Sequence, residues 1–139
     1  MTILDRFSLK GKIALVTAGA GPLFGRSISM ALAEAGATVI TASRSLAINE
    51  QFATEMRQLG HDVHGLSSDL EDLGSIDALH NEIQSRFGRL DVLVNSALAR
   101  GGHVGGFEEQ MPETWQHAAN GDFAGLFRHC QRAIESMKR

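Results

Sequence analysis

The chain has 139 residues, of which 43% are hydrophobic and 21% charged, so its size and composition suit one globular domain. A formal net charge of −3 and a pI of about 6.0 give no reason to expect a nucleic-acid partner. The apolar runs fall short of the roughly 20 residues that span a bilayer, and the N-terminus does not resemble a signal peptide. Cys130 is the only cysteine, which excludes an internal disulfide, and we therefore expect a cytoplasmic protein.

Four short apolar runs predict buried β-strands over residues 12–17, 38–42, 63–67 and 91–95. Segments with helical periodicity separate these strands. Strands joined by helical crossovers form a parallel sheet with right-handed connections. The sequence therefore predicts the α/β class, as a Rossmann-like doubly wound parallel sheet within a single domain over residues 1–139.

Three amphipathic helices are predicted between the strands. The first is expected to begin at Pro22, because proline suits the first helical position, and to be closed by Gly36. The second ends at Gly60, and either Asp72 or Ser75 caps the third.

A last helix is predicted to begin near Pro112, where Glu113 favours the helix dipole. Its expected apolar positions are Trp115, Ala119, Leu126, Cys130, Ala133 and Met137. We expect this helix to pack through that apolar face.

A glycine-rich loop, VTAGAGPLFGR, connects the first strand to the first helix and contains Gly19, Gly21 and Gly25. Such loops let a phosphate approach the unpaired N–H groups at a helix N-terminus. The spacing misses the G-x-G-x-x-G dinucleotide fingerprint by one residue, and the absence of Gly-Lys-Ser/Thr excludes a P-loop. A tight structural turn and a methyltransferase-type loop remain alternatives.

Polar residues follow the other three strands, at the edge of a parallel sheet where ligands bind. Arg44 stands where a 2′-phosphate would lie, and Ser43 leaves room there, so NADP is favoured over NAD. Asp69 suits the adenine amino group, and Asn95 suits side-chain bonds from the fourth strand to a neighbouring loop. A solvated Arg44 and a turn-forming Asp69 are the alternative interpretations.

Four segments in order make the chain resemble the N-terminal half of a short-chain dehydrogenase/reductase. Residues 17–25 resemble that family's T-G-x-x-x-G-x-G loop, and SDLED resembles its third-strand aspartate. GRLDVLVNSAL resembles G-x-L-D-V-L-V-N-N-A-G, and TWQHAANGDFAGLF resembles the family's tryptophan helix. The resemblance implies strand order 3-2-1-4, without the second half of the usual sheet, and NAD(P)-dependent hydride transfer between alcohols and ketones.

The resemblance also implies which residues would contact the cofactor. Five of them would lie on the pyrophosphate side: Thr17, Gly19, Gly21, Leu23 and Phe24. The others would meet the adenosine ribose, the adenine and the far part of the cofactor, respectively: Ser43 and Arg44; Asp69 and Leu70; Asn95, Ser96 and Ala97. Leu23 replaces a family glycine, so we expect weaker cofactor binding than the family's norm.

The catalytic residues of the family are the main departure. The position of its catalytic asparagine falls on Asp122, whereas Asn120 comes two residues early, about 200° around a helix. The family's Ser and Tyr-x-x-x-Lys would lie beyond residue 139, and the sequence contains no tyrosine. We therefore expect a truncated cofactor-binding portion that is inactive as a dehydrogenase by itself.

Two other functions stay open at this point: a non-catalytic nucleotide-binding or assembly module, and a methyltransferase-like binder of adenosylmethionine. We expect a homo-oligomer formed through the last helix, whether the chain is part of an oxidoreductase or a non-catalytic module. No metal site is predicted, because His61 and His64 lack a third ligand and are expected to face solvent. His103, in the second glycine-rich loop, is expected to lie at the surface.

Overall fold

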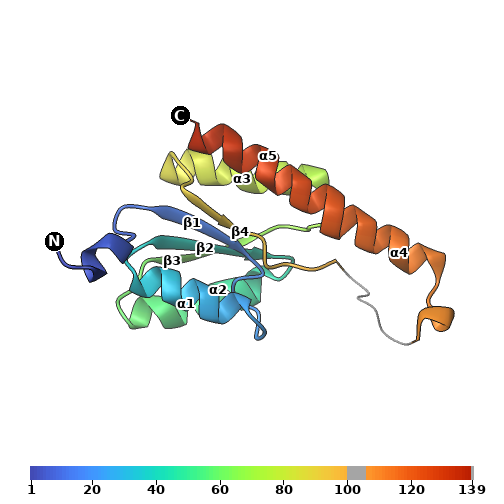
Figure 1. Ribbon diagram of the computed structural model, residues 1–139, viewed down its shortest axis with the longest axis horizontal. Coiled ribbons are helices and arrows are strands. Elements are labelled where there is room, and N and C mark those ends of the chain that lie inside the picture. The colour runs from blue at the N-terminus through green and yellow to red at the C-terminus, as the bar shows by residue number, and fades with distance from the viewer. Residues whose placement is uncertain (100–105, 139) are drawn as a thin grey trace.

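The computed structural model describes residues 1–99 and 106–138, which build a four-stranded parallel sheet in the order β3-β2-β1-β4 (Figure 1). The strands are β1 (Ile13–Thr17), β2 (Thr38–Ser43), β3 (Val63–Ser67) and β4 (Val92–Val94). The predicted class, sheet order and strand positions are confirmed, with strand ends shifted by one residue at most.

Alternation along the central strands divides the core between the two faces of the sheet. Ala14 and Val16 of β1 join one buried cluster, whereas Leu15 between them joins the other. In β2, Val39 belongs to the first cluster and Ile40 to the second. Both faces need helical cover for this reason, which is why the strands are apolar without interruption.

Helices cover both faces of the sheet (Figure 1). On one face lie α1 (Gly25–Glu34) and α2 (Leu46–Gln58), and on the other lie α3 (Leu73–Phe87) and α5 (Leu126–Met137). The chain also forms two short 3₁₀ turns, η1 (Leu4–Phe7) and η2 (Phe107–Glu109). The fold is therefore doubly wound, as predicted.

Most of the predicted helix boundaries are confirmed. Gly36 and Gly60 follow α1 and α2 with φ of 98° and 90°, a left-handed conformation that glycine adopts without strain. Asp72 caps α3, because its Oδ1 accepts from the N–H groups of Gly74 and Ser75. The prediction for Pro22 is wrong: α1 begins three residues later, at Gly25, and Pro22 lies in the turn before it.

The last helix is interrupted where a regular α-helix was predicted. It starts as α4 (Pro112–Ala118), widens into a π-helical segment, η3 (Ala119–Gly125), and continues as α5. In η3, a Cβ on Gly121 would lie 2.5 Å from Ala99 Cβ, and one on Gly125 would lie 2.0 Å from Leu70 O. The two glycines thus let the helix backbone lie directly against the segments that follow β3 and β4.

The predicted apolar face of this helix is not the buried one. Trp115, Leu126 and Met137 are 48%, 39% and 44% exposed, whereas Ala133 is buried as expected. The helix instead turns a mostly polar side, including the buried His129, toward α3. Apolar periodicity usually marks the core face of a helix, whereas here it marks the outer face.

The prediction that the fourth strand is buried is also wrong. All three residues of β4 are only half-buried. The strand pairs with β1 on one side, and among the described residues it has no neighbour on the other. Such an edge exposes backbone groups and one flank of each side chain. Within residues 1–99 and 106–138, no helix has the length and hydropathy needed to cross a bilayer.

Candidate functional site

The glycine loop is shaped by the backbone of Ala18, directly after β1. Ala18 has φ of 51°, a left-handed conformation that is uncommon for alanine, and its carbonyl oxygen accepts from the Gly21 N–H at 2.9 Å. A Cβ on Gly25 would lie 2.0 Å from that oxygen, so the start of α1 presses against the loop. Sequence reasoning missed Ala18, because alanine carries no signal for this conformation.

The residues before α1 offer hydrogen-bond donors to a ligand. Across residues 1–99 and 106–138, the N–H groups of Leu23 and Phe24 donate no hydrogen bond. No side chain caps α1, whereas Ser45 caps α2 and Asp72 caps α3. The positive end of the α1 dipole is therefore open to an anion.

A mainly apolar pocket of about 190 Å³ adjoins these donors. The side chains of Leu23 and Phe24, each 76% exposed, stand on one side of it. Ser96 and Leu98, from the segment after β4, stand on the other. The structure thus brings the glycine loop and the end of the fourth strand together, as the sequence analysis expected.

Thr17 holds these two segments together. Its Oγ1 accepts from the N–H groups of Ser96 at 2.9 Å and Ala97 at 3.0 Å, and lies 3.4 Å from Val94 O. The side chain is buried, so its hydroxyl serves the protein itself. Thr17 therefore supports the site by fixing the segment after β4 against the end of β1.

At the end of β2, Ser43 and Arg44 line an open recess together with Ser45 and Ile48. Arg44 is exposed and Ser43 is half-buried, which suits both to contact a ligand. Behind them lies Asn49, fully buried in the first turn of α2. The sequence analysis missed Asn49, although a polar residue on the buried face of an amphipathic helix is a detectable signal.

Asp69 shapes the turn between β3 and α3. Its Oδ1 accepts from the Glu71 N–H at 3.0 Å, and its own N–H donates to Ser75 Oγ at 2.9 Å. The turn-forming interpretation of Asp69 therefore describes the structure. Leu70, beside it, is half-buried and presents its carbonyl to Gly125.

Asn95 reaches α5, and not a neighbouring loop as expected. Its Nδ2 lies 3.5 Å from Cys130 Sγ. Its Oδ1 is buried and has no hydrogen-bond partner in the part of the chain that the structure describes. Ser68 Oγ, directly after β3, is likewise buried without a hydrogen-bond partner among the described residues. The sequence analysis missed Ser68. Unpaired buried acceptors and hydroxyls at a ligand-binding edge suit polar ligand contacts.

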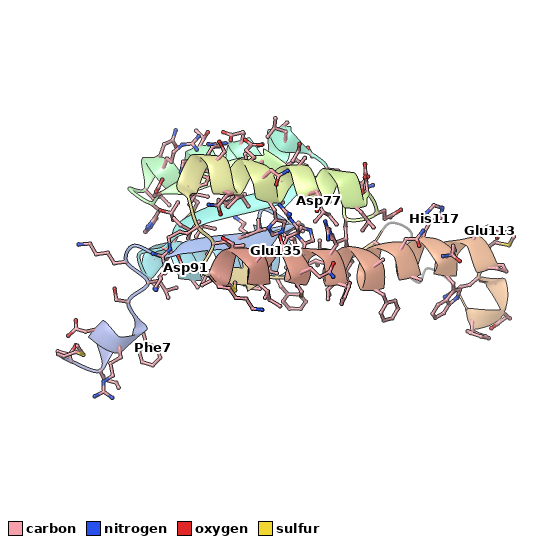
Figure 2. All side chains as sticks on the ribbon, turned by 90° about the horizontal axis from the view of Figure 1, so that it is seen from above. Phe7, Asp77, Asp91, Glu113, His117 and Glu135 are labelled. Carbon is pink, nitrogen blue, oxygen red and sulfur yellow. The ribbon has the colours of Figure 1, made fainter. Side chains whose placement is uncertain are left out.

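Asp122, at the position where the family's catalytic asparagine falls, has a structural partner. Its Oδ1 accepts from the Ala99 N–H at 2.8 Å. Asn120 is exposed and accepts from Gln116 at 3.2 Å. Beyond them α4 extends past the sheet, and its His117 Nδ1 lies 3.2 Å from Glu71 Oε2 (Figure 2).

The remaining histidines give no sign of a metal site. His64 is half-buried, bonded to Asp62 at 2.8 Å and packed edge-on against Phe87, so it does not face solvent as predicted. His61 is half-buried as well, and His103 lies outside the described residues. Within the described ranges, no group of three His, Cys, Asp or Glu residues is placed to hold a metal ion.

The known proteins to which this chain is similar include several dehydrogenases. A family model described as short chain dehydrogenase matches residues 12–139. The chain is 40% identical over 96 residues to a 2-dehydro-3-deoxy-D-gluconate 5-dehydrogenase from Pseudoalteromonas atlantica, covering 68% of this chain and 37% of that protein. It is 36% identical over 135 residues to a D-threitol dehydrogenase from Mycolicibacterium smegmatis, covering 94% and 49%.

Among solved structures, the fold resembles a gluconate 5-dehydrogenase from Burkholderia cenocepacia in complex with NADP and tartrate. The TM-score is 0.85 at 27% identity, and the match covers 96% of this chain and 51% of that one. The chain thus spans about half the length, or less, of these relatives. The family match over residues 12–139 shows that this chain belongs to the short-chain dehydrogenase family.

Proposed function

We propose that this chain is a dinucleotide-binding domain of an oxidoreductase that transfers hydride between an alcohol and a ketone. The proposal depends on one observation: within residues 1–99 and 106–138, the N–H groups of Leu23 and Phe24 donate no hydrogen bond, and no side chain caps the N-terminus of α1 beside them. This arrangement suits a pyrophosphate. A bound nicotinamide would supply or accept the hydride.

The other contacts follow the carboxyl edge of the sheet. The adenosine ribose would lie at Ser43 and Arg44, and adenine would lie beside Asp69 and Leu70. The far part of the cofactor would pass the segment after β4, where Asn95 Oδ1, which has no hydrogen-bond partner among the described residues, could accept from it. Along the strand order β3-β2-β1-β4, these residues succeed one another in the order adenine, ribose, pyrophosphate and far part of the cofactor, so one extended dinucleotide could contact them all.

We propose that the cofactor is NADP in preference to NAD. The exposed Arg44 guanidinium stands beside the recess at Ser43, where it would attract a 2′-phosphate. The Burkholderia structure described above contains NADP, which agrees with this choice.

We also propose that residues 1–139 bind the dinucleotide without turnover. The sequence contains no tyrosine to act as the acid/base of the reaction, and Asp122 is engaged by the Ala99 N–H.

A single, half-buried cysteine favours a reducing compartment, and we propose that the protein is cytoplasmic.

Titration of the chain with NADPH and NADH tests the proposal. We expect both to bind, and Arg44→Ala to weaken NADPH by about tenfold or more while changing NADH little, because a charged hydrogen bond is lost. Arg86→Ala is the matched control, since Arg86 is an exposed arginine on α3 that pairs with Glu82. Equal losses for both dinucleotides would refute the role of Arg44, and binding of neither would refute the function.

We further propose that the chain associates with a second copy through the outer side of the last helix. Large apolar side chains gather there: Trp115, Phe123, Leu126, Phe127, Ile134 and Met137. They are 39–74% exposed, which is unusual for six such residues along one helix. A two-fold contact would cover the same residues on both copies.

A further inference from the structure

Asn49 occupies a position from which it controls the ribose end of the proposed site. It lies in the first turn of α2, fully buried, directly behind the recess lined by Ser43, Arg44, Ser45 and Ile48. A buried amide is costly unless its hydrogen bonds are satisfied. All of its polar atoms do have partners, and these come from two strands.

The hydrogen-bond partners fix the orientation of the Asn49 amide. Its Nδ2 lies 2.7 Å from Leu66 O and 3.3 Å from Ser43 O. Carbonyl oxygens only accept, so the amide nitrogen must face them. The Oδ1 then faces the hydroxyl groups of β2.

That orientation determines which way the Ser43 hydroxyl points its proton. Ser43 Oγ lies 3.1 Å from Asn49 Oδ1, and because a carboxamide oxygen carries no hydrogen, Ser43 must donate. Thr41 Oγ1 lies 3.5 Å from the same oxygen. A hydroxyl has one proton, so Ser43 offers only acceptor lone pairs to the recess.

This polarity matters for the two forms of the cofactor. A free ribose 2′-hydroxyl has a proton to donate to Ser43. An ionised 2′-phosphate offers only acceptors, so it gains no hydrogen bond from Ser43 and meets lone-pair repulsion. Arg44 acts in the opposite direction, because its charge attracts the phosphate.

We propose that Asn49 is a specificity-determining residue, which holds the Ser43 hydroxyl as an acceptor and so limits the preference for NADP over NAD. The inference rests on the proposed function and assigns the selectivity to two opposing groups. Arg44 favours the phosphate, and the Asn49–Ser43 pair favours the hydroxyl. The chain therefore accepts both dinucleotides with a small difference in affinity.

Ser43→Ala provides the first test, because the sign of its effect reveals the direction of the proton. Removing an acceptor weakens NADH and relieves NADPH, so the ratio of NADPH affinity to NADH affinity should rise about fivefold. If Ser43 donated to the ligand, the same variant would lower that ratio. Ser85→Ala, an exposed serine on α3, should leave the ratio unchanged.

Asn49→Leu provides the second test, alone and combined with Ser43→Ala. Freed from Asn49, the Ser43 proton can turn to the phosphate, so the ratio should rise in the single variant. In the Ser43→Ala background, Asn49→Leu should leave the ratio unchanged, because no Ser43 hydroxyl remains for Asn49 to orient. A merely structural loss would weaken both dinucleotides alike, and the single variant would then show no rise in the ratio.

The outcomes separate the inference from the proposed function. A wild-type chain that binds neither dinucleotide refutes the function, and the inference falls with it. Binding of both, with a ratio that Ser43→Ala lowers or leaves unchanged, overturns the inference alone. Slow hydrogen exchange of the Asn49 side-chain amide, measured by NMR without ligand, is expected in addition, and fast exchange would contradict the buried network.

Discussion

At the scale of single residues, the site depends on side chains that satisfy backbone groups. Thr17 is the clearest case, because one buried hydroxyl accepts from two consecutive N–H groups, those of Ser96 and Ala97. Asp122 accepts from one such group, the Ala99 N–H. The segment after β4 is thus held at both ends by side chains from distant parts of the sequence.

Thr17→Val removes the hydroxyl and keeps the shape of the side chain. Two partly buried N–H groups would lose their acceptor, so we expect the free energy of unfolding to fall by about 2 kcal/mol. Urea-induced unfolding followed by circular dichroism measures this change. Thr17→Ser keeps the hydroxyl and is the control; equal losses in the two variants would contradict the assigned role.

Residue types predicted part of the site and left part of it hidden. The glycines, Arg44 and Asn95 were identified because ligand-binding edges favour such residues after parallel strands. Ala18 was missed, since its left-handed backbone is imposed by the packing of α1 and has no counterpart in the side chain. Asn49 could be detected as a polar residue on the buried face of α2, but its role depends on the Ser43 and Leu66 carbonyls, which only the fold brings to it.

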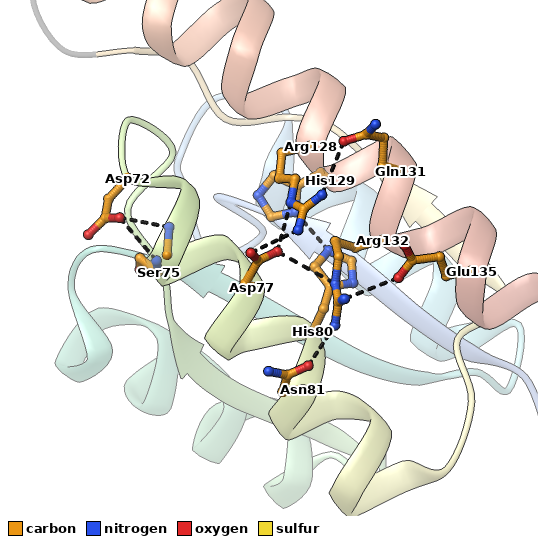
Figure 3. Close-up of polar contacts among 11 residues, drawn as sticks. Asp72, Ser75, Asp77, His80, Asn81, Arg128, His129, Gln131, Arg132 and Glu135 are labelled. Atoms are coloured by element: carbon orange, nitrogen blue, oxygen red, sulfur yellow. Dashed lines mark hydrogen bonds and ion pairs between the residues drawn. The ribbon is translucent and has the colours of Figure 1, made fainter.

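At the scale of elements, a polar seam joins α3 and α5 (Figure 3). Asp77 receives a two-pronged contact from Arg128, at 2.8 and 2.9 Å, and Arg132 donates to Asn81 at 2.6 Å. Between these pairs, His80 Nε2 and His129 Nδ1 lie 3.1 Å apart, both buried. Polar side chains therefore join the two helices, in addition to the buried cluster that Leu79 and Ile83 share with Ala133.

The histidine pair makes the stability of this seam depend on pH. Burial lowers the pKa of His129 to about 4. Burial, together with the positive charges of His129, Arg132 and Arg128, lowers the pKa of His80 to about 4, although Asp77 opposes this. Both imidazoles are therefore neutral in the folded chain at neutral pH.

We expect the free energy of unfolding to fall as the pH drops from 6.5 to about 4. In that window the unfolded chain binds protons that the folded chain refuses, so the loss approaches about 3 kcal/mol per imidazole. Above pH 6.5 the contribution is complete. Chemical denaturation at a series of pH values measures the slope.

The double variant His80→Leu/His129→Leu tests the origin of that slope. Replacing both partners by apolar groups leaves no unpaired donor or acceptor, so stability at pH 7 should change little. The part of the slope between pH 6.5 and 4 that belongs to the pair should disappear. A slope that persists unchanged would assign the effect to other groups.

The elements themselves were predicted well wherever apolar periodicity marked the core. This holds for α3, where Ile76 and Leu79 are buried as the apolar periodicity of the sequence indicates. In α2 it holds in part: Phe52 and Met56 are buried, whereas Ile48, at the same helical spacing, is 56% exposed. It fails for the last helix, since the seam with α3 is polar and the apolar stripe faces outward. A hydrophobic stripe indicates that a helix face will be covered. It does not identify the covering surface, which can be the core of the same chain or another molecule.

At the scale of the whole molecule, that outer stripe is the basis of the proposed self-association. Phe127→Arg should shift the chain toward the monomer, because a charge in the centre of a two-fold contact faces its own copy. Sedimentation equilibrium measures the change in mass. Leu59→Arg is the control, since Leu59 is 68% exposed and follows α2, on the opposite face of the sheet. A wild-type monomer at all concentrations would rule out the association.

The way the last helix lies across the molecule has a thermodynamic consequence. Its π-helical segment touches the turn after β3 through Gly125 and Leu70, and the segment after β4 through Asp122 and Ala99. The last helix thus lies against two stretches of the proposed binding edge and carries the outer stripe on its other side. Two binding equilibria that involve the same helix are reciprocally linked. The factor by which a bound dinucleotide strengthens the association of two copies equals the factor by which association strengthens dinucleotide binding.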